Sequence, residues 1–187
     1  MTAAQDFEAA LSRATDACAD TAAGLAAAGI PPEHLARVVT PRKILLWARP
    51  DTMQEFGSAW RLGTVLLGTD ARLYAAGRAT RAAERGRPGY QSVSREERRE
   101  IAAAALRGGI PAGEPVNFDA TPIPLRDSEI LPDARLAELL ADPELPVGYS
   151  AGEIRVRWRA GAPLEGAPSL ADFLRERAEL LRHPRPE

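Results

Sequence analysis

The sequence contains few of the residues from which metal sites and disulfide frameworks are built. One cysteine, Cys18, cannot form a disulfide within the chain, and His34 and His183 are the only histidines. No Cys/His spacing of a zinc site and no Asp-rich calcium loop is present. We therefore expect no metal ion and no cofactor. A single free thiol favours a reducing compartment, so we predict a cytoplasmic protein.

Long apolar runs and a large net charge are missing as well. No run of 18 apolar residues could form a membrane-spanning helix, so we expect no membrane partner. The first residues include Asp6 and Glu8 before any arginine, unlike a signal peptide. A net charge of −2 over 187 residues argues against disorder. We predict a single domain over residues 1–187, with a disordered tail at 183–187.

Basic residues are plentiful but unevenly distributed. Residues 42–110 carry 13 basic and 7 acidic side chains, whereas residues 111–151 carry 2 and 8. Lys43 is the only lysine, and all other basic residues are arginines. The two blocks could neutralise each other on the folded surface, which a net charge close to zero favours. The alternative is a basic patch that attracts anions.

The N-terminal segment is predicted to form a long helix from residue 3 to about residue 28. Apolar or small residues recur at steps of four and three, which indicates a helix with one buried seam. The seam comprises Phe7, Leu11, Ala14, Cys18, Thr21 and Leu25. Gly29 is the predicted C-terminal cap, and Pro31 follows it. Small seam residues allow close packing, either within the chain or against a second copy.

Short strands and helices alternate irregularly in the rest of the chain. Strands are predicted at 38–39, 44–47, 60–67, 73–77 and 153–159, edge strands at 115–118 and 123–125, loops at 51–58 and 78–92, and helices at 94–107, 133–141 and 170–182. Because strict βαβ alternation is missing, we predict an α+β fold. It has a mainly antiparallel sheet of five or six strands. A long N-terminal helix, a central helix and a C-terminal helix pack on one face.

Two local patterns make sharper predictions. Ser94 and Glu97 have the spacing of a capping box at the start of the central helix. Apolar and basic residues alternate strictly in 153–159. The apolar residues predicted to face the core are Ile154, Val156 and Trp158, and the basic residues predicted to face solvent are Arg155, Arg157 and Arg159.

Complete catalytic sets are missing from the sequence. There is no Gly-x-Ser-x-Gly motif, and two histidines leave few bases to activate a serine. His34 follows Pro32 and Glu33 and is predicted to lie in a turn. Cys18 lies on the helical seam, where a small buried residue is expected. An enzyme is therefore not the favoured interpretation.

The segment 77–90 is the strongest candidate for a binding site. Its basic residues are Arg78, Arg81, Arg85 and Arg87. They precede a helix N-terminus, which favours an anion, and guanidinium groups bind phosphate bidentately. The chain has no phosphate-loop motif and no aromatic platform for nucleic acid, so we do not expect it to bind nucleic acid. Alternatively, the segment is solvated or pairs with the acidic residues 127–144.

Three short runs carry a resemblance to known proteins. They are Trp60 to Leu67, Leu73 to Ala82, and Arg107-Gly108-Gly109. Together they resemble small uncharacterised bacterial proteins, some labelled as glutaminases, and the resemblance implies one intact domain. Serine-type glutaminases are larger and use a Ser-x-x-Lys pair, whereas Thr40 stands at that offset from Lys43 here. We therefore carry over neither the activity nor a catalytic residue.

The sequence as a whole predicts a small binding or interaction protein that forms a homodimer. This prediction depends on the small-residue seam of the N-terminal helix and on the incomplete catalytic sets. One alternative is a module that binds an anionic, phosphate-bearing ligand through the four arginines of residues 78–87. Another alternative is a hydrolase or amidase, which would need a concave pocket holding a hydroxyl or carboxylate beside a base.

Overall fold

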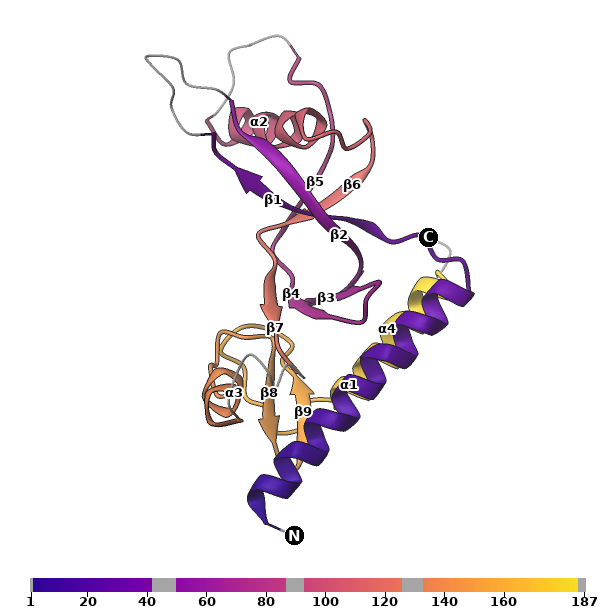
Figure 1. Ribbon diagram of the computed structural model, residues 1–187, viewed down its shortest axis with the longest axis vertical. Helices are drawn as coiled ribbons and strands as arrows, with labels where there is room; N and C mark the ends of the chain where they lie inside the picture. The colour runs from indigo at the N-terminus through magenta and orange to yellow at the C-terminus, as the bar shows by residue number, and fades with distance from the viewer. Residues whose placement is uncertain (1, 42–49, 87–92, 126–132, 185–187) are drawn as a thin grey trace. The chain divides into compact units, whose positions relative to one another are not determined.

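The computed structural model describes residues 2–41, 50–86, 93–125 and 133–184, and these residues form an α+β fold (Figure 1). The helices are α1 (Ala3–Ala27), α2 (Val93–Arg107), α3 (Asp133–Leu140) and α4 (Leu170–Arg182). The strands are β1 (Glu33–Val39), β2 (Thr52–Leu62), β3 (Val65–Gly68), β4 (Leu73–Ala75), β5 (Arg78–Arg81), β6 (Pro115–Phe118), β7 (Thr121–Ile123), β8 (Val147–Ser150) and β9 (Glu153–Val156). None of the described helices is long and apolar enough to cross a membrane.

Seven strands form one mainly antiparallel sheet in the order β5-β6-β1-β2-β3-β4-β7, and β8 and β9 form a separate antiparallel hairpin. The pairing of β1 with β6 is parallel. The predicted α+β class is therefore confirmed, with seven strands in the main sheet rather than five or six.

The chain divides into two compact units, each with its own hydrophobic core. Unit 1 consists of Met1–Pro31, Trp60–Ala75 and Pro122–Glu187. Unit 2 consists of Pro32–Ala59 and Ala76–Thr121. The prediction of a single domain over residues 1–187 stays a prediction.

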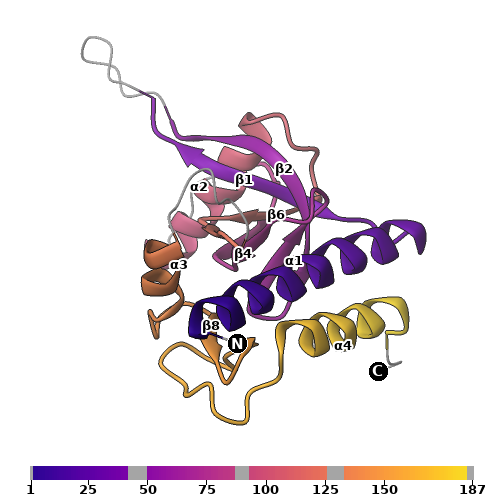
Figure 2. The same ribbon diagram turned by 60° about the horizontal axis from the view of Figure 1, so that its bottom comes forward.

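Unit 1 contains α1, whose seam is buried as the sequence predicts. Cys18 and Leu25 have exposures of 1% and 0%. Figures 1 and 2 show α4 running alongside α1, and α1 also contacts β9. The helix ends at the predicted place, because Gly29 adopts a φ of +67° that suits glycine. Since α4 and the rest of unit 1 fill the seam, α1 is packed within its own chain.

Unit 2 places α2 against β5 and the strands beside it. Consecutive alanines, Ala103 to Ala105, are buried and let the helix lie close to the sheet. Gly108 continues this close approach, because a Cβ there would lie 2.0 Å from the carbonyl oxygen of Met53. The helix begins at Val93, so Ser94 lies inside its first turn and not at the cap position that the sequence predicts.

The prediction of a loop at residues 51–58 is wrong, because most of this segment belongs to β2. Thr52 to Ala59 pair antiparallel with β1, with a bulge after Leu35. Met53 is the one buried residue between Thr52 and Ser58, so no alternating pattern marks the strand in the sequence. Residues 52–59 form a strand because they are hydrogen-bonded to β1, which is distant in the sequence.

Two predicted strands and one predicted loop also need correction. The predicted strand 60–67 is divided by a turn at Gly63, which has a φ of +64°. The predicted loop 78–92 begins with β5, which pairs with β6, while residues 87–92 and the predicted strand 44–47 lie outside the described residues. The predicted edge strand 115–118 lies between β5 and β1. Proline is tolerated there because Pro115 is the first residue of β6.

Candidate functional site

The arginines predicted to bind an anion have protein partners in the structure. Arg78 Nη2 lies 2.8 Å from Asp119 Oδ2, and its Nη1 lies 3.6 Å from Glu97 Oε1. The same guanidinium lies over the ring of Phe118, 4.7 Å from its centroid. Arg81 donates through Nη1 to the carbonyl oxygen of Gly113 over 2.9 Å. Arg87 lies outside the described residues.

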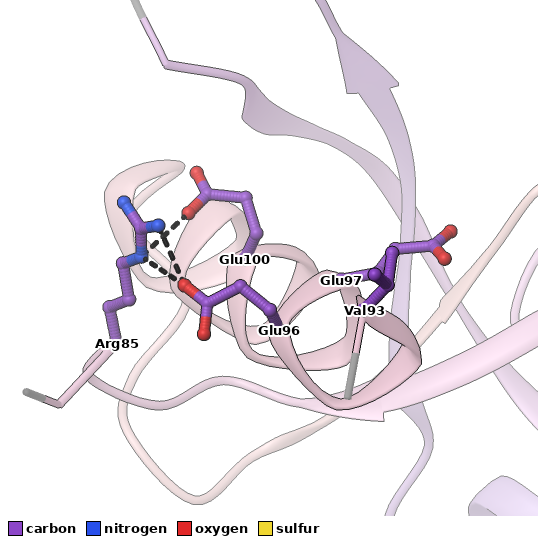
Figure 3. A pocket seen from close by; sticks show the side chains of 5 residues that line it. All are labelled: Arg85, Val93, Glu96, Glu97 and Glu100. Atoms are coloured by element: carbon purple, nitrogen blue, oxygen red, sulfur yellow. Dashed lines mark hydrogen bonds and ion pairs between the residues drawn. The ribbon is translucent and has the colours of Figure 1, made fainter. Parts of the chain in front are cut away.

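Arg85 lines an open hollow together with Val93, Glu96, Glu97 and Glu100 of α2 (Figure 3). Its Nη2 lies 2.7 Å from Glu96 Oε1, and its Nε lies 3.3 Å from Glu100 Oε2. The hydrogen bond to Glu96 and the charge of Glu100 raise the pKa of Arg85. Two carboxylates therefore contact this guanidinium, whereas the Glu97 carboxylate points away from it (Figure 3). A phosphate entering the hollow would have to compete with both carboxylates for Arg85.

The basic segment thus ties β5 to α2. Among the described residues, its ion-pair partners are Asp119 and the glutamates of α2, and none lies in the described part, 133–144, of the acidic block considered from the sequence. Among the described residues, no group of three or more His, Cys, Asp and Glu could hold a metal ion.

His34 lies in β1 and not in the predicted turn. Its Nδ1 lies 2.7 Å from Glu55 Oε1 on β2, and Ser58 stands directly opposite it in the strand register. A hydroxyl, an imidazole and a carboxylate therefore lie near one another. The structure shows no hydrogen bond between Ser58 and His34, and the hollow beside α2 includes neither residue. The geometry is that of a hydrogen-bonded pair between neighbouring strands, one-quarter exposed at the histidine.

The thiol of Cys18 is buried in the core of unit 1, which makes it unreactive. Burial raises the pKa of its thiol to about 12. The thiolate is the nucleophilic form of cysteine, so almost none of the reactive species exists at neutral pH. Cys18 is a structural residue of the α1 seam.

The prediction that Trp158 is buried and Arg157 exposed is wrong, because β9 ends at Val156. Arg157 is 6% exposed and Trp158 is 70% exposed. The Arg157 guanidinium donates to three carbonyl oxygens, those of Leu145, Val147 and Ala162, at 3.0 to 3.1 Å. A buried guanidinium needs partners for its donors, and these carbonyls provide them. With Arg157 turned inward, the next side chain points outward.

Arg155 also has partners instead of facing solvent alone. Its Nε donates to the carbonyl oxygen of Ser150 over 3.3 Å, and its Nη1 donates to the carbonyl oxygen of Ala167. The predicted solvated row of three arginines therefore has two members bound to backbone carbonyls. Arg159 is the remaining member.

Arg159 is held against the exposed ring of Trp158. Its Cζ lies 4.5 Å from the ring centroid, within the range of a cation–π interaction. No ion pair of Arg159 exists among the described residues. The positive charge is thus exposed, oriented and not neutralised within the described part of the chain.

A neighbouring loop brings negative charge next to this pair. The amide of Gly161 donates to the carbonyl oxygen of Pro143 over 2.9 Å, and the amide of Arg157 donates to that of Pro146 over 2.7 Å. Asp142 and Glu144 are exposed on this loop and likewise form no ion pair with any described residue. We call Trp158, Arg159, Asp142, Pro143 and Glu144 the Trp158 surface. The run Ala160-Gly161 after Arg159 marks a loop in the sequence, but nothing there indicates that Trp158 leaves the core.

Comparison of the chain with models of protein families, with curated proteins and with solved structures gives no match. The resemblance of residues 38–118 to proteins labelled as glutaminases stays a prediction. Function is therefore inferred from geometry and charge.

Proposed function

We propose that this chain is a small cytoplasmic interaction protein that binds a protein partner through the Trp158 surface. The observation that carries this proposal is the 70% exposure of a tryptophan stacked against an arginine that has no ion pair within the described part of the chain. Tryptophan and arginine are enriched among the residues that dominate the binding energy of protein interfaces. A partner that covers Trp158 would remove a large aromatic surface from water.

Hydrogen bonds that hold the loops of the Trp158 surface in place strengthen the proposal. Arg157 binds three carbonyl oxygens directly beneath the loop, and two backbone hydrogen bonds join that loop to its neighbour. A surface held in one conformation loses little conformational entropy when it binds. The favourable contacts of Trp158 and Arg159 would then contribute to affinity with little offset from lost conformational entropy.

The two alternatives have less support. A phosphate would compete for Arg78 and Arg85 with carboxylates already in contact with them. A hydrolase would need a concave pocket that holds a hydroxyl or carboxylate beside a base, and in the hollow beside α2 the glutamates are paired with arginines.

The test compares partner binding by the wild type and by Trp158→Ala. The full chain is used to capture its partner, which is then purified and titrated calorimetrically. Loss of a dominant interface tryptophan should weaken the complex by a factor of about 30 or more. Leu181→Ala is the matched control, because Leu181 is also an exposed large hydrophobic residue, at 36%. Equal affinities for the wild type and Trp158→Ala would contradict the proposal.

A further inference from the structure

We propose that the partner of the Trp158 surface is a second copy of this chain, related to the first by a two-fold axis. The inference rests on the proposed function and names its partner. It follows from the charges on the surface, which are of both signs. Arg159 lies on one loop, and Asp142 and Glu144 lie on the loop beside it.

Two-fold symmetry explains why both signs occur side by side. In such an interface residue i of one protomer contacts residue j of the other, and j contacts i in turn. Arg159 then faces the partner subunit's Asp142 and the partner subunit's Glu144, and the same contact is repeated on the other side of the axis. The two Trp158 rings cover each other near the axis. Each exposed group of the surface thereby gains a partner of matching chemistry.

Within one protomer, backbone hydrogen bonds join the two loops of the Trp158 surface, and their opposite charges form no ion pair. Arg159 is stacked on Trp158, and the hydrogen bonds from Gly161 to Pro143 and from Arg157 to Pro146 set the spacing of the loops. Arg159 therefore forms no ion pair with Asp142 or Glu144 of its own chain. Asp142 Oδ1 accepts a hydrogen bond from the backbone amide of Glu144. All three charges have no ion pair among the described residues, so each could form one with a second molecule.

Other occupants fit these charges less well. A nucleic acid would be attracted by Arg159 but repelled by Asp142 and Glu144 at the same place. The seam of α1, which the sequence offered as a dimer contact, is filled by α4 and the core of unit 1. A protein of different sequence remains as the alternative outcome of the test.

The dimer is expected to be reversible. Two loops form a smaller surface than the roughly 800 Å² per partner of a standard interface. We expect a dissociation constant in the micromolar range, with weaker association at high salt because ion pairs contribute.

The first experiment is sedimentation velocity of the full chain over two decades of concentration around the micromolar range. The wild type and Leu181→Ala should shift from monomer to dimer. Trp158→Ala should stay monomeric over the same range, with an unchanged circular dichroism spectrum and unfolding midpoint. A dimer that Trp158→Ala does not weaken would overturn the inference.

The second experiment exchanges the charges. Arg159→Glu alone, and the double variant Asp142→Arg and Glu144→Arg alone, place like charges across the axis twice and should both be monomeric. An equimolar mixture pairs opposite charges at both contacts and should dimerise. A mixture that stays monomeric while the wild type dimerises would overturn the two-fold arrangement.

The two proposals fail in different ways. A wild type that is monomeric throughout overturns the second copy as partner. If the chain then captures a different protein, and Trp158→Ala loses it, the proposed function stands with that protein as partner. If Trp158→Ala still binds the captured protein, both proposals fail.

Discussion

Two groups of arginines look similar in the sequence but meet different partners in the structure. Arg78 and Arg85 lie on and just after β5, where Asp119 and the glutamates of α2 neutralise them. Arg157 and Arg159 follow β9, where the first is buried among carbonyl oxygens and the second is stacked on an exposed ring. The comparison shows that the availability of a charge depends on the groups around it.

The largest effect on stability is expected for Arg157, the buried arginine after β9. Arg157→Ala leaves three carbonyl oxygens without their donor and opens a cavity beneath the loop, which should cost about 3 kcal/mol of unfolding free energy. Urea unfolding measures this loss as a lower midpoint with an unchanged slope. Arg159→Ala is the matched control and should leave the midpoint where it is. Equal midpoints for the wild type, Arg157→Ala and Arg159→Ala would show that the two arginines do not differ in their contribution to stability.

Gly77 lies next to Arg78, and substituting it tests how closely the backbone is packed there. A Cβ on Gly77 would lie 2.3 Å from the carbonyl oxygens of Phe118 and Asp119. Gly77→Ala must therefore move the backbone that presents Asp119 to Arg78, at a cost of about 2 kcal/mol. Thermal unfolding provides the measurement. Gly57→Ala is the control, since nothing lies within 4 Å of the added methyl, and it should be close to neutral.

Cys18 reports on the core of unit 1 through the pH dependence of stability. The pKa of its thiol is about 12 in the folded protein, against 9.0 for the model thiol. The unfolded chain releases this proton first, so the stability contribution is complete below about pH 9 and is lost as the pH rises toward 12. The slope in this window is about 1.4 kcal/mol per pH unit. Cys18→Ala should unfold with a flatter profile, and identical profiles would contradict the burial of the thiol.

The smallest effect is expected for phosphate, whose binding site the sequence predicts at the arginines of residues 78–87. We expect phosphate to leave the melting temperature of the wild type unchanged, because carboxylates already occupy Arg78 and Arg85. The double variant Arg78→Ala and Arg81→Ala should behave in the same way toward phosphate. A salt-sensitive rise in the wild type that this variant loses would restore the anion-binding alternative.

The candidate site was much harder to predict than the helices. None of the four predicted arginines belongs to the Trp158 surface, and Trp158 itself was expected in the core. The alternation of residues 153–159 is correct as far as Val156, where β9 ends. The end of the strand depends on carbonyl oxygens of Leu145, Val147 and Ala162, which a local pattern does not contain.

Periodicity and capping residues were sufficient to predict where the helices lie and which fold class they form. The seam and C-terminal end of α1, the bounds of α4 and the α+β character follow from periodicity and caps, because a helix forms its hydrogen bonds within four residues. Tertiary structure alone decided that 52–59 is a strand, that Arg85 is neutralised and that Trp158 faces outward. Each of these depends on groups distant in the chain, whose positions are set only when the chain has folded.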